Sequence, residues 1–376
     1  MIIRTLESQV KNSLFSGEVI VLYGPRRVGK TTLVKKLVQE YNGMYLDCEL
    51  DPINTRLKEM SSLDQMKAFI EDKTFIVLDE AQVISGIGQK LKSLVDHFPE
   101  VQILATGSSS FELSHQVGEP LVGRARWFHM YPLSIREIRG NEPAFMLQSK
   151  LETLLIYGAM PSVYTEDSLA EKEQLLYRLS SGLLYKDILA FEDVRKATKI
   201  KDLLKALALQ VGSEVSYSEI GDLINVDLRT VERYIDLLEK SFVIKVIRPL
   251  YTNPRTELKK KVKVYFYDLG LRNALIQNFN PLDIRQDKGA LWENFCFLEF
   301  MKKKYESDFH NLYFWRNRRQ QEVDMVEMKN GKYYAYECKF NPRKTAKLPK
   351  AFIDTYPEHE FAVINSENFY TYFIED

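Results

Sequence analysis

The segment from residue 18 to residue 31 constrains the fold more than any other part of the sequence. A short apolar run rich in β-branched residues, Glu18 to Tyr23, leads directly into a glycine-bounded loop and then into a helical pattern, Lys30 to Tyr41. The loop fits G-x-x-x-x-G-K-[ST], in which the glycines let main-chain amides approach phosphate oxygens at a helix N-terminus. We expect nucleotide to be bound by Gly24, Pro25, Arg26, Arg27, Val28, Gly29, Lys30, Thr31 and Thr32.

Two residues of this loop carry chemistry. Lys30 is expected to reach the β- and γ-phosphates, where it would be catalytic, and the Thr31 hydroxyl is expected to ligate magnesium. The predicted cofactors are therefore ATP and Mg²⁺.

A second apolar run, Phe75 to Leu78, ends in Asp79 and Glu80. Alone, it would be a buried strand followed by a solvated acidic turn. Beside a phosphate loop, Asp79 can hold magnesium and Glu80 can act as the general base that polarises the attacking water.

The N-terminal part alternates apolar strands with helical patterns, which predicts a parallel sheet covered on both faces. The expected strands are residues 18–23, 43–46, 73–78 and 101–105. Ligands bind at the carboxyl ends of such strands. Thr106 and Ser108 follow the last strand and either orient the water or simply cap a turn. Arg124 and Arg126 either supply transition-state charge, in cis or from a neighbouring subunit, or are exposed loop residues.

The strings GPRRVGKTTL, FIVLDEAQ, ILATGSSS and LVGRARWFHMYPLSIRE resemble the prokaryotic AAA+-type ATPases of the STAND-related archaeal ATPase group. The resemblance implies that Lys30, Thr31, Asp79 and Glu80 form the nucleotide site. Members of that group join the ATPase to a further C-terminal region. AAA+-type sites lie between subunits in many cases, so a homo-oligomer is one open expectation.

The composition sets limits on other classes of function. The chain has 376 residues, and its 52 basic and 52 acidic residues give a formal net charge of zero, so bulk charge indicates neither nucleic acid nor membrane as a partner. Three widely spaced cysteines predict neither a zinc site nor a disulfide framework. The absence of a signal-like start and of an 18-residue apolar run predicts a cytoplasmic protein without a membrane partner.

Residues 216–239 read as a helix-turn-helix followed by two strands, the pattern of a winged helix. The second helix buries Val231, Ile235 and Leu238 at i, i+4 and i+7. The residues expected to face a major groove are Arg229, Thr230 and Arg233, and those expected to touch phosphates are Lys259, Lys260, Lys261 and Lys263. The alternative is a packing or protein-contact module, because Glu232, Asp236 and Glu239 would repel a phosphate backbone.

The last hundred residues contain a nuclease-like pattern. Asp324 on one strand can meet Glu337 and Lys339 on the next, across an Asn330-Gly331 hairpin turn. Two carboxylates and a lysine there could bind magnesium and activate a water for phosphodiester cleavage. The alternative is a structural hairpin with surface charges.

Glu293 lies on a helix, Leu291 to Phe300, that is apolar almost all round, so its charge requires a metal or a cation. With Asp324 and Glu337 it completes the predicted metal ligands. Here the chain resembles the PD-(D/E)xK nuclease fold, although Val323 replaces the proline of that pattern. The nearby arginines, which hold a nucleic-acid backbone or form a solvated loop, are Arg316, Arg318 and Arg319.

The predicted fold class is α/β with four parts. They are a P-loop AAA+-type ATPase core at 1–140, a helical lid or linker at 141–210, a winged helix at 211–268 and a restriction-endonuclease-like domain at 269–376. The first hypothesis is a magnesium-dependent ATPase that controls a DNA-directed winged-helix and nuclease-like module. The second is an ATP-driven switch whose C-terminal half is a catalytically inactive protein-interaction module. A small-molecule kinase fits less well, because Asp79 and Glu80 suit the activation of water.

Overall fold

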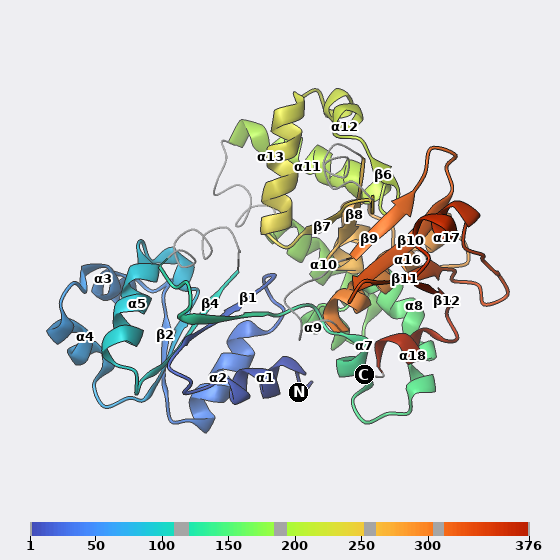
Figure 1. Ribbon diagram of the computed structural model, residues 1–376. Coiled ribbons are helices and arrows are strands. Elements are labelled where there is room, and N and C mark those ends of the chain that lie inside the picture. Colours follow the sequence, from blue (N-terminus) through green and yellow to red (C-terminus); the bar gives the residue numbers. More distant parts are fainter. Residues whose placement is uncertain (1, 109–119, 184–193, 252–260, 304–311, 375–376) are drawn as a thin grey trace. The chain divides into compact units, whose positions relative to one another are not determined.

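The computed structural model describes residues 2–108, 120–183, 194–251, 261–303 and 312–374 (Figure 1). The chain divides into two compact units. Unit 1 comprises Met1–Pro132 and Lys240–Phe242, and unit 2 comprises Leu133–Glu239 and Val243–Asp376. The predicted division into four domains remains a prediction.

Unit 1 is built on a five-stranded sheet whose pairings are all parallel, in the order β2-β3-β4-β1-β5. The strands are β1 (Val19–Tyr23), β2 (Met44–Asp47), β3 (Phe75–Asp79), β4 (Gln102–Gly107) and β5 (Ala125–His129). The predicted parallel α/β sheet is therefore confirmed, with β5 as a strand that the sequence reading did not include.

Helices cover this sheet on both faces. One face, which includes Val21 and Ile76, packs with buried residues of three helices, and the alternate residues Ile20 and Leu22 are also buried on the other face. The helical elements of unit 1 are α1 (Leu6–Asn12), α2 (Lys30–Glu40), α3 (Asp51–Glu59), α4 (Leu63–Ile70), η1 (Ala81–Val83) and α5 (Ile87–His97). A Ser62–Gln65 capping box starts α4, since each residue satisfies a main-chain amide of the other.

Unit 2 begins with helices. They are α7 (Ile135–Arg139), η3 (Ala144–Met146), α8 (Leu147–Tyr157), α9 (Pro161–Tyr164), α10 (Leu169–Leu183), α11 (Val194–Leu209) and, later in the chain, α15 (Leu269–Leu275). Ser134 and Glu137 form a capping box at the start of α7. Gly158 ends α8 with a positive φ of 75°, which favours glycine. A side chain would not fit there either, because a Cβ would lie 2.3 Å from Asp268 Oδ1.

The middle of unit 2 holds a helix-turn-helix beside a three-stranded antiparallel sheet of order β6-β8-β7. The elements are β6 (Glu214–Val215), α12 (Tyr217–Ile224), α13 (Leu228–Lys240), β7 (Ile244–Ile247) and β8 (Val262–Phe266). Asn225, with φ of 54°, ends α12, and Asp227 caps α13 through the Thr230 amide at 3.0 Å. The predicted helices and the buried positions Val231, Ile235 and Leu238 are present.

The last part of unit 2 is a four-stranded mixed sheet of order β12-β11-β10-β9. In chain order the elements are α16 (Lys288–Lys303), β9 (Leu312–Arg316), β10 (Glu322–Lys329), β11 (Lys332–Cys338), α17 (Lys350–Thr355), β12 (His359–Ile364) and α18 (Phe369–Phe373). β10 pairs antiparallel with β9 and β11, whereas β12 pairs parallel with β11. The Asn330-Gly331 turn has positive φ at both residues, as a type I′ hairpin requires.

The two sheets of unit 2 are connected directly. Pro249, after β7, forms a parallel bridge with Phe314 of β9. The Leu250 amide donates to the Phe314 carbonyl at 2.7 Å, and the Phe314 amide donates to the Arg248 carbonyl at 3.3 Å. The three-stranded and the four-stranded sheets of unit 2 are therefore joined by main-chain hydrogen bonds.

Candidate functional site

The glycine-rich loop lies between β1 and α2, where its backbone needs glycine at two positions. Gly24 has φ of 145° and Gly29 has φ of 101°. A Cβ on Gly24 would stand 2.2 Å from the Met130 carbonyl oxygen, so no side chain fits there. The Lys30 side chain is 4% exposed, and its Nζ donates to the Gly24 and Pro25 carbonyls, each at 2.9 Å. The loop thus encloses its lysine at the N-terminus of α2.

Arg4 binds this loop and was not singled out from the sequence. Its guanidinium donates to the Val28 carbonyl at 2.5 Å and to the Tyr131 carbonyl at 2.6 Å. One side chain therefore joins the phosphate loop to the segment that follows β5. A lone arginine near the N-terminus gives no sequence signal for such a contact.

Asp79 ends β3 at the edge of the sheet where the loop follows β1. Both of its carboxylate oxygens accept hydrogen bonds: Oδ2 from the Tyr45 hydroxyl at 2.6 Å, and Oδ1 from the Thr106 hydroxyl. The strand that carries Thr106, β4, lies between β1 and β3. Burial, followed by the hydrogen bond to Asp79, raises the pKa of Tyr45, so this hydroxyl stays a donor.

Glu80 follows directly, with a left-handed φ of 54° that turns the chain away from the strand. Its amide donates to Thr106 Oγ1 at 3.0 Å, and its carboxylate accepts from Gln82 Nε2 at 2.5 Å. Gln82 Nε2 also reaches Ser108 Oγ at 3.2 Å. The polar side chains at the tips of β3 and β4 therefore form one hydrogen-bonded group, which includes Thr106 and Ser108.

These residues fit ATP with magnesium. The positive-φ glycines and the α2 N-terminus are suited to phosphate, and the Asp79 carboxylate with the half-buried Thr31 hydroxyl offers the oxygen ligands that Mg²⁺ requires.

Arg124 and Arg126 do not lie near this group. The first residues of β1 and β5 pair in register, so both arginines are at the amino ends of the strands, opposite to the phosphate loop. Arg124 pairs with Asp96 at 2.6 Å, and Arg126 pairs with Glu18. This position excludes the alternative in which they act in cis on the phosphates, and Arg126 belongs to a strand rather than a loop.

On α13, Arg229 and Arg233 are exposed, as predicted. Thr230 has a different task, because its hydroxyl donates to Asp227 at 2.7 Å within the helix cap. Beside this helix lies a groove of about 640 Å³ between the start of α12, α13, β7 and β8. Its charged lining residues are Glu232, Asp236, Glu239, Arg248 and Lys261. The groove therefore mixes charges and does not form a basic channel.

The predicted row of phosphate-binding lysines is corrected in part. Lys259 and Lys260 lie outside the described residues. Lys261 pairs with Glu219 at 3.5 Å. Lys263 is 1% exposed and points inward, where no phosphate backbone can reach it.

The structure brings Asp324, Glu337 and Lys339 together. Met325 pairs with Tyr336 in register, which places Asp324 opposite Glu337. Lys339 Nζ lies 2.5 Å from Glu337 Oε2 and 3.2 Å from Asp324 Oδ2, and the Cys338 amide donates to the same aspartate oxygen at 2.8 Å. Burial, together with the nearby Asp324 charge, raises the pKa of Glu337 to about 7. The lysine therefore occupies the space between the two carboxylates.

Glu293 of α16 has partners of its own. Its Oε1 accepts from Lys263 Nζ at 2.7 Å and from the Tyr265 hydroxyl at 2.5 Å, both on β8. Lys263 also pairs with Glu322 of β10. The requirement for a compensating charge beside Glu293 is thus met by a lysine.

Arg316 extends this network and does not lie in a solvated loop. Its guanidinium is 3.3 Å from both Glu214 of β6 and Glu322 of β10. Arg318 and Arg319, in the turn after β9, are exposed.

The predicted ligands Glu293, Asp324 and Glu337 do not form a ready cation site. Among the residues that the structure describes, no three His, Cys, Asp or Glu side chains are grouped so that they could hold a metal ion. Each carboxylate here is instead bound to a lysine. The C-terminal site therefore does not fit the divalent ion that the nuclease-like pattern implies.

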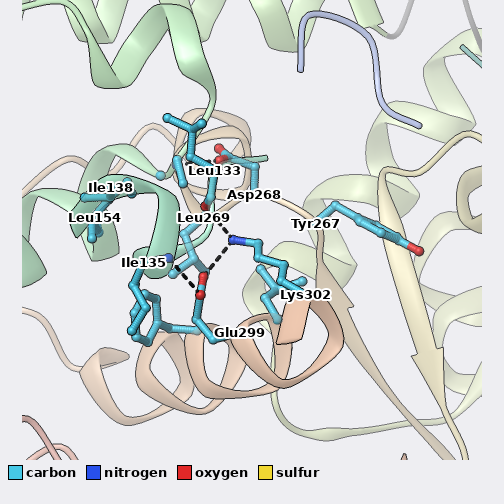
Figure 2. Close-up of a pocket in the computed structure, with 13 residues that line it drawn as sticks. Leu133, Ile135, Ile138, Leu154, Tyr267, Asp268, Leu269, Glu299 and Lys302 are labelled. Carbon is cyan, nitrogen blue, oxygen red and sulfur yellow. Dashed lines mark hydrogen bonds and ion pairs between the residues drawn. The ribbon is translucent and has the colours of Figure 1, made fainter. Parts of the chain in front are cut away.

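A buried ion pair on α16 anchors the segment where unit 2 begins (Figure 2). Glu299 and Lys302 lie 2.7 Å apart, and their side chains are 3% and 5% exposed. The Ile135 amide donates to Glu299 at 3.0 Å, and Lys302 donates to the Leu133 carbonyl at 2.9 Å. The first turn of α7 is therefore fixed to the helix that also carries Glu293.

Comparison with known proteins agrees with the N-terminal geometry. Residues 16–139 match the family model described as an AAA domain, and residues 148–282 and 288–374 match two domains of unknown function, DUF8612 and DUF4143. In fold, the chain is similar to a Walker-type ATPase of Pyrococcus abyssi, with a TM-score of 0.52 and 18% identity over 73% of this chain and 96% of that chain. Unit 1 thus carries a P-loop ATPase domain.

The relatives in sequence span most of the chain. An uncharacterized protein of Mycobacterium tuberculosis is 26% identical over 95% of this chain and 81% of its own length. One from Methanocaldococcus jannaschii is 25% identical over 76% of this chain and 69% of its own length. In the part of the chain that the structure describes, no helix combines the length and the apolar character needed to cross a membrane.

Proposed function

We propose that the protein hydrolyses ATP in a magnesium-dependent reaction and that this cycle controls unit 2. The observation that carries the proposal is the polar group in which Thr106 links Asp79 to Glu80, at the same sheet edge as the phosphate loop. When bound with ATP, magnesium would be held by Thr31 and Asp79 and would offset phosphate charge.

The chain's own residues supply the remaining steps. Lys30 would exchange its two loop carbonyls for phosphate oxygens. Glu80, held by Gln82, would take a proton from the attacking water. The main-chain amides around Gly29 and the α2 N-terminus would stabilise the developing phosphate charge.

ATP turnover by three variants tests this assignment. Lys30→Ala is expected to lose nucleotide binding. Glu80→Gln is expected to bind ATP normally but to hydrolyse it about a hundred- to a thousandfold more slowly, the usual loss when a proton acceptor is removed. Glu59→Gln, at an exposed position on α3, is the control and should behave as wild type. Unchanged turnover in Lys30→Ala would contradict the proposal.

Control of unit 2 is supported by a short covalent path. Arg4 ties the phosphate loop to Tyr131, and Leu133 and Ile135 are bound by Glu299 and Lys302 of α16. A change in the shape of the phosphate loop on binding nucleotide would therefore shift Tyr131, and the next residues, from Leu133 on, are hydrogen-bonded to α16.

For unit 2 we propose a DNA-directed winged helix. The support is the order α11-β6-α12-α13-β7-β8 with sheet order β6-β8-β7, together with the exposed Arg229 and Arg233. Fluorescence anisotropy with a labelled duplex at two salt concentrations tests it. Arg229→Ala with Arg233→Ala should weaken binding and flatten the salt dependence, whereas the exposed Arg178→Ala on α10 should not. The ATPase rate measured with and without the same duplex then tests the coupling.

A second candidate for the C-terminal segment is a nuclease-like fold that serves as a binding module without cleaving. The order of α16, β9–β11, α17 and β12 supports the nuclease-like arrangement. The lysine bound to each carboxylate favours the non-cleaving form. Plasmid incubated with Mg²⁺ should stay intact with wild type and with Asp324→Ala. If wild type cuts the plasmid and Asp324→Ala does not, the C-terminal segment is an active nuclease and the non-cleaving proposal is wrong.

A further inference from the structure

Lys263 is a buried lysine whose ammonium group reaches the C-terminal acidic site from another sheet. This site consists of Glu293, Glu322, Asp324 and Glu337. The lysine comes from β8, whereas its two partners come from α16 and β10. Its ammonium group lies 2.7 Å from Glu293 Oε1 and also pairs with Glu322, so carboxylates from two different elements bind it.

We propose that Lys263 is a built-in counter-cation of the C-terminal acidic site, which takes the place of a divalent metal ion and leaves the site metal-independent. The proposal rests on the nuclease-like arrangement proposed above. Lys263, from the three-stranded sheet, would neutralise the carboxylates that a metal ion would otherwise neutralise beside the four-stranded sheet.

The geometry at Glu293 supports this assignment. Its Oε1 already accepts two short hydrogen bonds, from Lys263 and Tyr265. A magnesium ion needs direct oxygen contacts at about 2.1 Å in a nearly octahedral arrangement. At this oxygen it would meet a fixed positive charge, which repels it in a poorly screened environment.

Main-chain pairing on both sides of β8 holds Lys263 in place, so that its side chain stays directed at Glu293 and Glu322. β8 is the central strand of its sheet, and Lys263 pairs with Glu214 of β6 on one side and Ile247 of β7 on the other. The ammonium lies 5.4 Å from the centre of the Phe314 ring, so an aromatic face also confines it. A side chain that is 1% exposed and held in a central strand cannot swing into solvent.

The other half of the site follows the same pattern. Lys339 lies between Asp324 and Glu337, and Arg316 lies between Glu214 and Glu322. Each described carboxylate of this network thus has an internal cation. A site neutralised in this way offers a divalent ion little electrostatic gain.

The test is a Mn²⁺ titration of the full-length protein without nucleotide, followed by electron paramagnetic resonance of the free ion. Wild type and Asp324→Asn should give the same curve, because the proposal assigns no metal to Asp324. Lys263→Met should gain one Mn²⁺ site that binds at least about tenfold more tightly than any site in wild type. The double variant Lys263→Met with Asp324→Asn should lack this new site. Lys261→Met, two residues earlier and exposed, is the matched control and should gain none.

Two results would overturn the proposal. One is a Mn²⁺ site in wild type that Asp324→Asn abolishes, a comparison that does not depend on Lys263→Met folding. The other is a Lys263→Met protein with native circular dichroism that gains no site. The titration contains no nucleotide, so loss of the ATPase assignment, through unchanged turnover in Lys30→Ala, would leave its outcome unaffected.

Discussion

The Tyr45 hydroxyl donates a 2.6 Å hydrogen bond to Oδ2 of Asp79. The two residues lie on neighbouring parallel strands, β2 and β3, and Thr106 from β4 binds the other oxygen of the same carboxylate. The aspartate is thus oriented from both sides before any ligand arrives. Groups that orient a metal-binding carboxylate in this way contribute to metal affinity without touching the metal.

Tyr45→Phe should therefore weaken activation of the ATPase by magnesium. We expect about a tenfold higher Mg²⁺ requirement, because the carboxylate loses a charge-assisted hydrogen bond. ATP turnover across a Mg²⁺ titration measures it. Tyr177→Phe on α10 is the control, and identical Mg²⁺ curves for the two variants would show that Tyr45 has no part in the site.

Gly24→Ala should disable the phosphate loop. The new methyl group would lie 2.2 Å from the Met130 carbonyl oxygen at a backbone φ of 145°. Gly86→Ala is a matched control, since Gly86 also has positive φ but has no neighbouring atom within 4 Å of a Cβ. Urea unfolding should show a loss of about 1–2 kcal/mol for the control and about 3 kcal/mol or more for Gly24→Ala. Equal losses of unfolding free energy in the two variants would mean that Met130 can move away from the new methyl group without cost.

Breaking the Glu299–Lys302 pair should destabilise unit 2. Lys302→Met leaves Glu299 buried without its ammonium partner, and removal of one member of a buried pair costs about 3–5 kcal/mol. Replacing both residues by leucine should cost clearly less, because no charge is left unpaired. Chemical denaturation measures both losses. Lys303→Met, exposed at the next position, should lie close to wild type.

Asp287 should make stability depend on acid pH. Burial opposes its ionisation, but hydrogen bonds from Arg285 and Arg272 outweigh this and lower the pKa of Asp287 to about 2. A carboxyl group whose pKa is lowered in the folded state stabilises the protein at pH values above its ordinary pKa, here by about 2 kcal/mol. This stabilisation is lost as the pH falls from about 4 towards 2.

Asp287→Asn should accordingly lower the unfolding free energy at pH 7 by about 3 kcal/mol, since two buried guanidinium groups lose their partner. The difference from wild type should be constant above pH 5 and shrink below pH 4. Asp283→Asn, at an exposed position nearby, should show no such trend. A difference that grows on acidification would contradict the sign of the shift.

Much of unit 1 could be predicted because its signals are local. The phosphate loop is a contiguous motif, β1 before it is an apolar run, and β3 is apolar up to Asp79. β5 was missed because its residues Ala125 to His129 include an arginine and a histidine, and this strand lies at the sheet edge, where burial is incomplete. The same edge position leaves Arg126 exposed, which is typical of a loop residue.

The charge partners in unit 2 could not be predicted, because they join residues far apart in the sequence. The burial of Glu293 on an apolar helix correctly indicated a compensating cation, yet the sequence did not say which. Lys263 follows three consecutive lysines, a context that favours exposure, and its inward direction depends on pairing with β6 and β7. Only the assembled sheet decides which face each of these side chains takes.

The bridge between Pro249 and Phe314 limits how this protein can be dissected or recombined. A truncation that ends after β8 would remove the strand to which Leu250 is hydrogen-bonded, and one that starts at α16 would uncover the outer ladder of β9. Unpaired strand edges recruit other chains. Gene fusions and expression trials should therefore keep residues 133–376 as one inseparable cassette, and shuffling between homologues should place its crossover before α7.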